Sequence, residues 1–414
     1  MITLQSIKEA KSSFKDFIKT TYLDYSPRLS NEYGANIYLK REDKQIVRSY
    51  KIRGAFNLIN SLPDEEKKSG IVCASAGNHA QGVAITCREL QIKGTIFMPL
   101  TTPEQKVYKT KKFGGEFVDV VLMGDTFDEA LSGARDFEKQ YQATFVHPFD
   151  DERIITGQAT VGLEIIEQFE GKGNIDYIIC PIGGGGLISG MISIFAGTNT
   201  KIIGVEPLGA PTLKHSIDAG EIRTLHKIDT FVDGAAVKRP GDKTFEIVKN
   251  AKVPIYLSPE NRICSTIMEY LKEDGLVLEP AGALSSDILK DREVQEMIKG
   301  KNVVLIVSGG NFDFERLPEV KERSLKYEGL KRYFLISFPQ RPGALKEFLS
   351  YLGSDDDITR FEYLKKSNKE KAPAFVGIQT SHKDNFLILS EKLKHAGIHF
   401  EDITDNDMYF DLLI

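Results

Sequence analysis

Features that mark several common classes of protein are scarce in this chain. Only four of its 414 residues are cysteines, they are scattered, and no two form a Cys-x-x-Cys pair. The seven histidines do not have the spacing of metal ligands. These absences argue against a disulfide framework and against a metal site. They favour free, buried thiols in a reducing cytoplasm.

The chain also has no excess of basic residues and no long apolar run. Its formal net charge is −5, whereas a nucleic-acid-binding protein normally presents a basic face. No apolar stretch is long enough to span a bilayer, and residues 1–10 lack the apolar core of a signal peptide. We therefore expect a cytoplasmic protein with no nucleic-acid or membrane partner.

The length and the periodicity of the chain predict several domains, the first of them α/β. A chain of 414 residues exceeds one average domain. From about 36 to 310, short β-branched runs alternate with longer segments of helical period. The run at 303–307 is almost continuously apolar, as in strands buried on both faces of a parallel sheet. In such folds ligands bind at the carboxyl ends of the strands.

The composition and the pattern of the sequence change after about residue 313. The segment 314–323 is highly charged and is interpreted as a connector. A compact unit of six alternating elements follows it. The expected elements are a strand at 333–338, a helix at 342–349, strands at 358–364 and 374–380, a helix at 383–395 and a strand at 399–403. This order, βαββαβ, predicts a ferredoxin-like arrangement.

Four stretches of the α/β region carry chemistry when they are considered together. The first, 49–55, places Lys51 between a β-prone run and a helical pattern. Alone, a lysine at a helix start is usually a solvated surface charge. The second stretch, 75–82, forms a strand-to-helix turn, where backbone N–H groups without intrahelical partners can bind an anion. Asn78 within it could equally be a plain helix cap.

The third stretch is a run of four glycines at 183–186, directly after an expected strand. Such a run lets the backbone wrap closely around a phosphate. No lysine follows the glycines, and Ser189 occupies the place of the third glycine of a dinucleotide fingerprint. Nucleoside triphosphates, NAD and FAD are therefore disfavoured. The fourth stretch, 308–311, ends the buried strand, and Ser308 alone could be a simple turn residue.

Together, the four stretches resemble those of the fold type II, tryptophan-synthase-β-like pyridoxal-phosphate enzymes. Within that group they are most similar to the threonine dehydratase (threonine ammonia-lyase) family. The stretch 339–345 resembles the start of the ACT-like regulatory domain of the biosynthetic members. The resemblance covers almost the whole chain.

The resemblance implies both a fold and its division into domains. Two open α/β subdomains would form an α/β catalytic region at 1–320, with the smaller subdomain, about 45–145, inserted in the larger. A connector at 321–331 would follow. A C-terminal ferredoxin-like α+β domain, ACT-like and βαββαβ, would occupy 332–414.

The resemblance also implies the roles of individual residues. Lys51 would form the Schiff base with pyridoxal 5'-phosphate and act as the catalytic base at the substrate's Cα. Asn78 would bind the ring hydroxyl, and Ser308 the pyridine nitrogen. The phosphate would lie on Gly183, Gly184, Gly185, Gly186 and Leu187. The substrate carboxylate would dock on Ser75, Ala76, Gly77, Asn78 and His79.

The implied reaction is a β-elimination that converts L-threonine to 2-oxobutanoate and ammonia, the first step of isoleucine synthesis. The hydroxyl of Ser308 is neutral and does not stabilise a protonated pyridinium as an aspartate would. A cofactor held in this way suits rapid loss of a β-substituent better than transamination. Serine is a second candidate substrate.

Several alternatives remain open at this point. Serine racemases carry a serine where Ala76 stands, and alanine cannot transfer a proton, so racemisation is not expected. Cysteine synthases share the fold but typically differ in the substrate loop. Some relatives bind a cation at positions matching Glu206, Ala210 and Thr212. Because threonine replaces the usual acidic ligand, no divalent metal is expected, although a monovalent ion is not excluded.

The C-terminal unit favours a biosynthetic enzyme over a catabolic serine/threonine dehydratase, which usually lacks it. Its expected role is to sense isoleucine, and its plain alternative is a stabilising or dimerising module. The chain carries one ACT-like unit where some members carry two, which leaves open whether sensing needs a second subunit. A homo-oligomer, dimer or tetramer, is expected. A remote alternative is a non-catalytic amino-acid-binding regulator.

Overall fold

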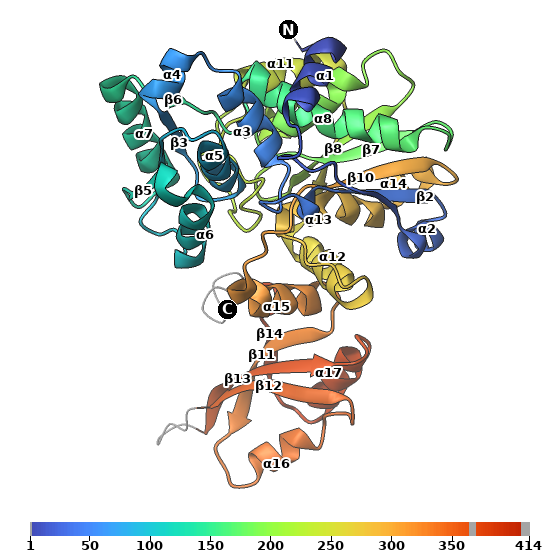
Figure 1. The fold of residues 1–414 in the computed structure, drawn as a ribbon. Coiled ribbons are helices and arrows are strands. Elements are labelled where there is room, and N and C mark those ends of the chain that lie inside the picture. The colour runs from blue at the N-terminus through green and yellow to red at the C-terminus, as the bar shows by residue number, and fades with distance from the viewer. Residues whose placement is uncertain (1, 364–369, 407–414) are drawn as a thin grey trace. The chain divides into compact units, whose positions relative to one another are not determined.

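A computed structural model describes residues 2–363 and 370–406 of the chain. The fold comprises two compact units (Figure 1). The first consists of Met1–Glu260 and Gly275–Phe312, and the second of Asn261–Asp274 and Asp313–Ile414. The last residue of the strand expected at 358–364 lies outside the described residues.

The larger sheet of the first unit has six strands, and its order is β1-β2-β10-β7-β8-β9. β1 runs antiparallel to β2, and the other neighbours are parallel. The strands are β1 (Leu23–Tyr25), β2 (Asn36–Arg41), β7 (Tyr177–Pro181), β8 (Lys201–Pro207), β9 (Ile255–Ser258) and β10 (Asn302–Val307). In β10, Leu305 pairs with Leu39 on one side and Ile179 on the other. This central, buried position explains the continuous apolar run of β10.

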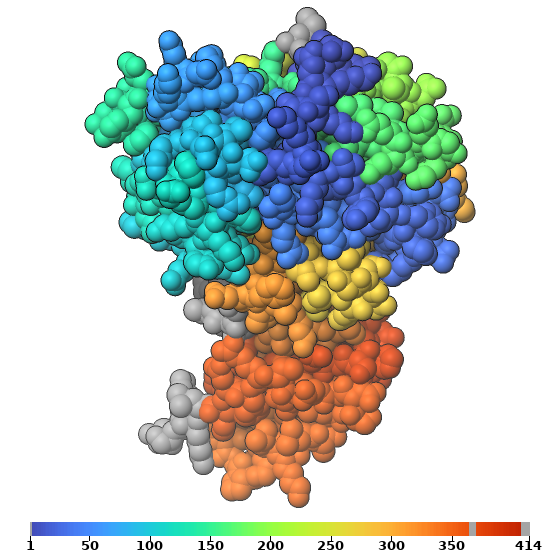
Figure 2. All heavy atoms as spheres, in the orientation of Figure 1, coloured from blue at the N-terminus to red at the C-terminus, as the bar shows by residue number. Residues whose placement is uncertain are grey.

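Helices cover both faces of this sheet, as its parallel crossovers require. They are α1 (Leu4–Ser13), α2 (Pro27–Tyr33), α8 (Glu152–Phe169), α9 (Gly186–Ile194), α10 (Thr212–Ala219), α11 (Asp242–Ala251), α13 (Pro280–Asp287) and α14 (Arg292–Ile298). α9 and α13 both contact β7. Figure 2 shows α1, in dark blue, on the outside of the first unit.

The smaller sheet is fully parallel, with the order β5-β4-β3-β6. Its strands are β3 (Ile71–Ala74), β4 (Gly94–Met98), β5 (Val118–Leu122) and β6 (Thr144–Phe145). The helices of this region are α3 (Lys51–Asn60), α4 (Asp64–Ser69), α5 (Asn78–Glu89), α6 (Glu104–Gly114) and α7 (Phe127–Tyr141). Figure 1 shows α5, α6 and α7 around this sheet. The structure therefore contains the two open α/β sheets that were predicted.

Local side-chain bonds set several of the helix starts. Thr126 and Glu129 form a reciprocal capping box before α7. α8 begins at Glu152. The carboxylate of Asp151 accepts the N–H of Arg153 and so extends the helix toward its N-terminus. Short 3-10 helices occur at η1 (Glu42–Lys44), η2 (Gly115–Phe117), η3 (Ile288–Lys290) and η4 (Phe314–Arg316).

The second unit contains a four-stranded antiparallel sheet in the order β12-β13-β11-β14. Its elements are α15 (Leu317–Tyr327), β11 (Lys331–Pro339), α16 (Ala344–Leu349), β12 (Asp356–Tyr363), β13 (Lys371–Thr380), α17 (Asn385–His395) and β14 (Phe400–Asp402), with most of α12 (Glu260–Glu273). From β11 onward the order is βαββαβ, which confirms the predicted arrangement. The segment interpreted as a connector is mostly the helix α15.

The chemistry of the described residues is consistent with these two cores. All four cysteines are buried and free of disulfides. None of the described helices has the length and apolar character needed to cross a membrane. The domain limits inferred from the resemblance remain a prediction, and the two units differ from them because α12 belongs largely to the C-terminal unit.

Candidate active site

Lys51 is the first residue of α3 and lies close to the end of β10. The backbone N–H of Tyr50 donates to the carbonyl oxygen of Ser308 at 3.2 Å, and Ser49 forms an isolated bridge with Gly309. The Nζ atom of Lys51 donates to the carbonyl oxygen of Pro148 at 3.0 Å. The fold therefore brings the first and fourth stretches together, although they are far apart in the sequence.

The surroundings of Lys51 favour its neutral amine. The side chain is half-buried, and its desolvation lowers its pKa from 10.5 to about 8, while the nearby carboxyl group of Glu279 opposes that shift. A lysine amine is nucleophilic and basic only when it is neutral, and desolvation is one established way to make it so. Lys51 therefore has the electrostatics of a reactive lysine.

The second stretch forms the N-terminus of α5. Gly77 precedes the helix, and its N–H donates to the hydroxyl oxygen of Ser75 at 3.3 Å. The ring of His79 is buried, and its Nε2 lies 2.9 Å from the carbonyl oxygen of Val146. Burial lowers the pKa of His79 to about 3, so the ring is neutral and donates Nε2–H to that carbonyl. The first-turn N–H groups of α5 have no acceptor within the helix and can receive a carboxylate.

The glycine run joins β7 to α9, and neighbouring protein atoms explain why it consists of glycines. A Cβ at Gly184 would lie 2.3 Å from the ring of Phe149. A Cβ at Gly183 would lie 3.0 Å from the Cα of Ala235. Gly185 has φ +91, a conformation that favours glycine. The run therefore leaves no space for side chains, and its backbone N–H groups at the start of α9 are the groups that could bind an anion.

Leu187 contributes to this site differently from the glycines. Its side chain is buried in the hydrophobic core of the larger sheet, with Ile178 and Val304 in the same cluster. Only its backbone N–H, in the first turn of α9, can serve an anion. The implied role of Leu187 is thus compatible with the structure only through the backbone.

Polar side chains meet beside Lys51. The hydroxyl of Ser308 donates to the carbonyl oxygen of Ala281 at 3.2 Å. Asn78 donates from Nδ2 to Oε1 of Glu279 at 2.7 Å, and its Oδ1 accepts from Nδ2 of Asn311 at 2.7 Å. The hydrogen of Ser308 can serve only one acceptor at a time, so a pyridine nitrogen would compete with the Ala281 carbonyl for it.

The loop 146–150, after β6, was not singled out from the sequence, yet it touches most of the site. His147 accepts at Nδ1 from the N–H groups of Phe149 and Asp150, at 3.2 and 2.8 Å. The carboxylate of Asp150 accepts backbone N–H groups at the start of α11. Pro148 accepts from Lys51, and Phe149 lies against the glycine run. No sequence pattern marked this loop, because the two-residue strand β6 before it carries no period.

The possible cation position near Glu206 has protein partners. Both carboxylate oxygens of Glu206 accept backbone N–H groups, from Leu213 and Lys214, at 2.8 Å. Thr212 donates its hydroxyl to the carbonyl oxygen of Val237. Across 2–363 and 370–406, no cluster of three or more His, Cys, Asp or Glu residues has the geometry to hold a metal.

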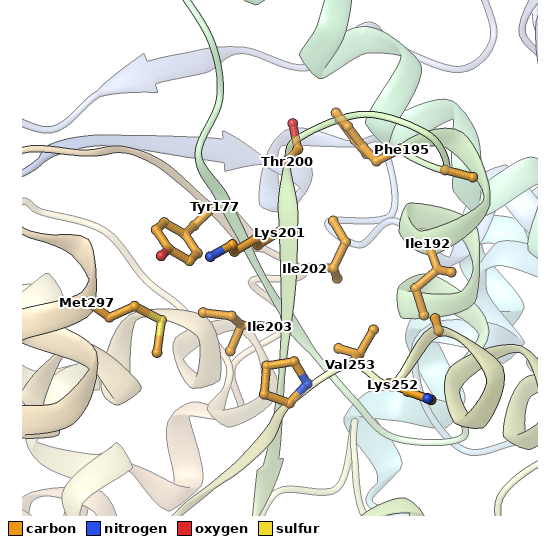
Figure 3. A pocket seen from close by; sticks show the side chains of 13 residues that line it. Tyr177, Ile192, Phe195, Thr200, Lys201, Ile202, Ile203, Lys252, Val253 and Met297 are labelled. Atoms are coloured by element: carbon orange, nitrogen blue, oxygen red, sulfur yellow. The ribbon is translucent and has the colours of Figure 1, made fainter.

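A separate cavity of about 620 Å³ lies at the amino-terminal ends of β7 and β8 in the larger sheet (Figure 3). It includes Tyr177 and Lys201, the first residues of β7 and β8, with Met297 of α14. The Nζ atom of Lys201 lies 5.7 Å from the centre of the Tyr177 ring. None of the predicted site residues lines this cavity.

The residues present fit pyridoxal phosphate. A desolvated lysine, a glycine-lined turn at a helix N-terminus, and amide and hydroxyl groups lie around one region of the first unit. Lysine can bind the aldehyde, the turn can bind the phosphate, and the polar groups can bind the ring. The individual roles of these residues remain predictions.

Comparison with known proteins identifies the family of both units. The family model for "Pyridoxal-phosphate dependent enzyme" matches residues 14–309. The model for "C-terminal regulatory domain of Threonine dehydratase" matches residues 322–413. The two matches together cover the α/β region and the ferredoxin-like sheet.

Individual relatives agree with these family matches. A biosynthetic L-threonine dehydratase of Halalkalibacterium halodurans is 50% identical over 100% of this chain and 99% of its own length. The processed form of tomato (Solanum lycopersicum) threonine deaminase isoform 2 is similar in structure, with a TM-score of 0.72 and 39% identity over 77% of this chain and 92% of that chain. Maize serine racemase follows with a TM-score of 0.71 and 29% identity, over 79% of this chain and 98% of that chain.

These findings confirm the resemblance inferred from the four stretches and from the C-terminal unit. This chain belongs to the biosynthetic L-threonine dehydratase family of pyridoxal-phosphate-dependent enzymes.

Proposed function

We propose that this protein deaminates L-threonine to 2-oxobutanoate and ammonia as the first step of isoleucine synthesis. The observation that carries the proposal is the environment of Lys51. Its amine has a pKa of about 8 and lies within reach of the loop that packs on the glycine run. Pyridoxal phosphate, when bound, withdraws electrons from the substrate's Cα.

The chain's own residues bind the substrate and move its proton. The N-terminus of α5, at 75–79, receives the substrate carboxylate. Lys51 removes the proton from Cα once its amine is free, and Pro148 is positioned to accept a hydrogen bond from that amine. Glycines 183–186, with the N–H of Leu187, hold the cofactor phosphate.

Asn78 and Ser308 complete the proposed site by holding the cofactor ring. Both residues are already anchored by protein partners, Glu279 and Ala281. The neutral hydroxyl of Ser308 keeps the ring a moderate electron acceptor, which favours elimination of the β-hydroxyl over transamination.

Ala76 distinguishes elimination from racemisation. Racemisation requires a proton donor on the face of Cα opposite to Lys51, and the methyl group of Ala76 cannot supply one. The structural likeness to maize serine racemase therefore concerns the fold of the catalytic region. We expect no measurable conversion of L-threonine or L-serine to the D-isomer.

The C-terminal unit favours the biosynthetic role over a catabolic serine/threonine dehydratase, because a regulatory-domain model matches it. Isoleucine is the proposed effector, as the end product of the pathway. The intact Lys51, Asn78, glycine run and Ser308 argue against a non-catalytic regulator. A homo-oligomer, dimer or tetramer, and a cytoplasmic location are also proposed, the latter supported by four free, buried cysteines.

The test is an assay of 2-oxo acid formation from L-threonine and L-serine, with and without isoleucine. We expect activity on threonine and inhibition by isoleucine. No 2-oxo acid from either substrate after reconstitution with the cofactor would refute the proposed function. An active enzyme whose rate and thermal stability do not change when isoleucine is added would refute the proposed effector alone.

A further inference from the structure

Glu279 is a buried carboxyl group beside the proposed cofactor site to which the proposed mechanism assigns no step. It lies at the N-cap of α13, a position where an acidic side chain usually accepts an N–H of its own helix. Here its side chain makes no such bond. Its Oε1 instead accepts from Nδ2 of Asn78 at 2.7 Å.

The backbone around Glu279 keeps this carboxyl group in place. The residue as a whole is only 5% exposed. A Cβ at Gly309 would lie 2.0 Å from Oε1, so the carboxyl group packs directly against the backbone that follows Ser308. The N–H of Gly282 donates to the backbone carbonyl of Glu279 at 2.8 Å and fixes the start of α13.

Asn78 is held from its other side by Asn311. Nδ2 of Asn311 donates its two hydrogens to Oδ1 of Asn78 and to the carbonyl oxygen of Val47, both at 2.7 Å, and lies 3.2 Å from Oε1 of Gln81. An amide whose oxygen already accepts and whose nitrogen already donates has one orientation with both bonds made. In that orientation, one hydrogen of Nδ2 remains for a ligand.

We propose that Glu279 is a positioning residue, which together with Asn311 orients the Asn78 amide so that it presents an N–H to the ring oxygen of the cofactor. This inference rests on the proposed function, and in particular on the role of Asn78. This role explains why a carboxyl group is buried here although its burial costs free energy.

The charge state of Glu279 is compatible with this role. Burial, aided by Asp233, raises the pKa of Glu279 to about 7, while Asn78, Lys106 and Arg48 act in the opposite direction. Both the ionised and the protonated carboxyl group can accept from Asn78. A glutamine at this position keeps an acceptor oxygen of nearly the same shape, whereas an alanine removes the acceptor.

The test compares two cofactors on apoenzyme variants. Pyridoxal phosphate and 3-deoxypyridoxal phosphate, which lacks the ring hydroxyl, are titrated separately, and binding is followed by the absorption of the lysine-bound cofactor. We expect Glu279→Ala to weaken binding of pyridoxal phosphate about tenfold and binding of the deoxy compound less than about twofold. Glu279→Gln is expected to bind both compounds like the unchanged enzyme.

Asn311→Ala provides an independent variant in case Glu279→Ala does not fold, which thermal unfolding will show. It removes the other anchor and should give the same ligand-selective loss. Equal weakening for both cofactors in either alanine variant, or a Glu279→Gln variant as weak as Glu279→Ala, would overturn the proposal. If the unchanged enzyme binds neither cofactor, the proposed function itself fails, which is a separate outcome.

Discussion

Lys51 owes its proposed reactivity to its position at the start of α3. The helix places the amine among buried groups, and burial is the main cause that lowers its pKa to about 8. An ordinary lysine, with a pKa near 10.4, would be less than about 0.1% neutral at pH 7, whereas Lys51 is about a tenth neutral. The environment thus supplies a population of reactive amine at physiological pH.

This shift predicts the pH dependence of cofactor attachment. Because the pKa of Lys51 is lowered, its neutral fraction rises as the pH passes through about 8, well below the range of an ordinary lysine. The initial rate at which the apoenzyme binds pyridoxal phosphate, followed by absorbance, should be half-maximal near pH 8. An inflection above pH 10 would contradict the inferred environment of Lys51.

The close packing of Gly184 against the ring of Phe149 leads to a second prediction at the level of single residues. A Cβ at position 184 would lie 2.3 Å from the Phe149 ring, so Gly184→Ala forces the loop or the glycine run to move. We expect a loss of stability of about 1–3 kcal/mol and weaker cofactor binding.

Phe149→Ala, which empties the space, should recover part of that loss in the double variant. Urea unfolding and cofactor titration of the two single variants and the double variant measure the coupling. Strictly additive effects would contradict the steric explanation of Gly184.

A buried network of charges connects α3, which carries Lys51, with β2, η1 and α8. Arg53 of α3 forms ion pairs with Glu42 of η1 at 2.8 Å and with Glu164 of α8 at 2.7 Å. Lys40 of β2 pairs with Glu164 at 2.6 Å. All four side chains are at most 2% exposed, and two positive groups face two negative ones. The network therefore fixes α3, and with it Lys51, against β2 and α8.

The network predicts that Glu164→Gln strongly destabilises the folded protein. Burial would raise the pKa of Glu164, but Arg53 and Lys40 hold it below its ordinary value. Removing this carboxylate leaves two buried cations short of a partner. We expect the free energy of unfolding at neutral pH, measured with urea, to fall by about 3–5 kcal/mol. Because the folded-state pKa is lowered, this stabilisation is present above the ordinary glutamate pKa and should diminish as the pH falls below about 4.

Glu167→Gln is the matched control on the same helix. Glu167 pairs with Lys11 but is half exposed, so this change should alter stability by less than about 1 kcal/mol. Similar losses for the two variants would show that the buried network has no special role.

Elements with strong periodicity could be predicted from the sequence, and weakly patterned ones could not. The continuous apolar run at 303–307 predicted β10 (Asn302–Val307) to within one residue at each end. The two-residue strand β6 carries no period that could reveal it. α13 is buried over its whole length, so it has no polar face to mark it as a helix.

The organisation of the whole chain departs from a simple order of domains. The second unit takes Asn261–Asp274, most of α12, from a stretch between two parts of the first unit. Within the second unit, Ser265 contacts Ser324 of α15, with 3.2 Å between the hydroxyl oxygens, and Arg323 donates to Asn261 at 3.2 Å. α12 and α15 therefore support each other inside the C-terminal unit.

This arrangement predicts the outcome of two truncations. A chain ending at Phe312 leaves α12 without α15, and it should unfold at a temperature at least about 5 °C lower than a chain ending at Tyr327. Both should form 2-oxo acid without an isoleucine effect. Differential scanning calorimetry and the activity assay provide the comparison. Equal unfolding temperatures would contradict the structural role of α15.

The candidate site could be predicted where its residues lie in stretches with a known chemical pattern. Lys51, Asn78, the glycine run and Ser308 belong to such stretches, and the fold brings them together. Glu279 and the loop 146–150 could not be found in that way. Their importance arises from contacts with Asn78, Lys51 and the glycines, which only the folded chain reveals.

The most direct test of the account is to locate the covalently bound cofactor. The purified protein is reduced with borohydride, digested, and its peptides are analysed by mass spectrometry. We predict one pyridoxyl-phosphate group, on Lys51, and none in the Lys51→Ala variant. An unmodified Lys51 in cofactor-reconstituted protein, or a group fixed on another lysine of the unchanged protein, would contradict the central claim.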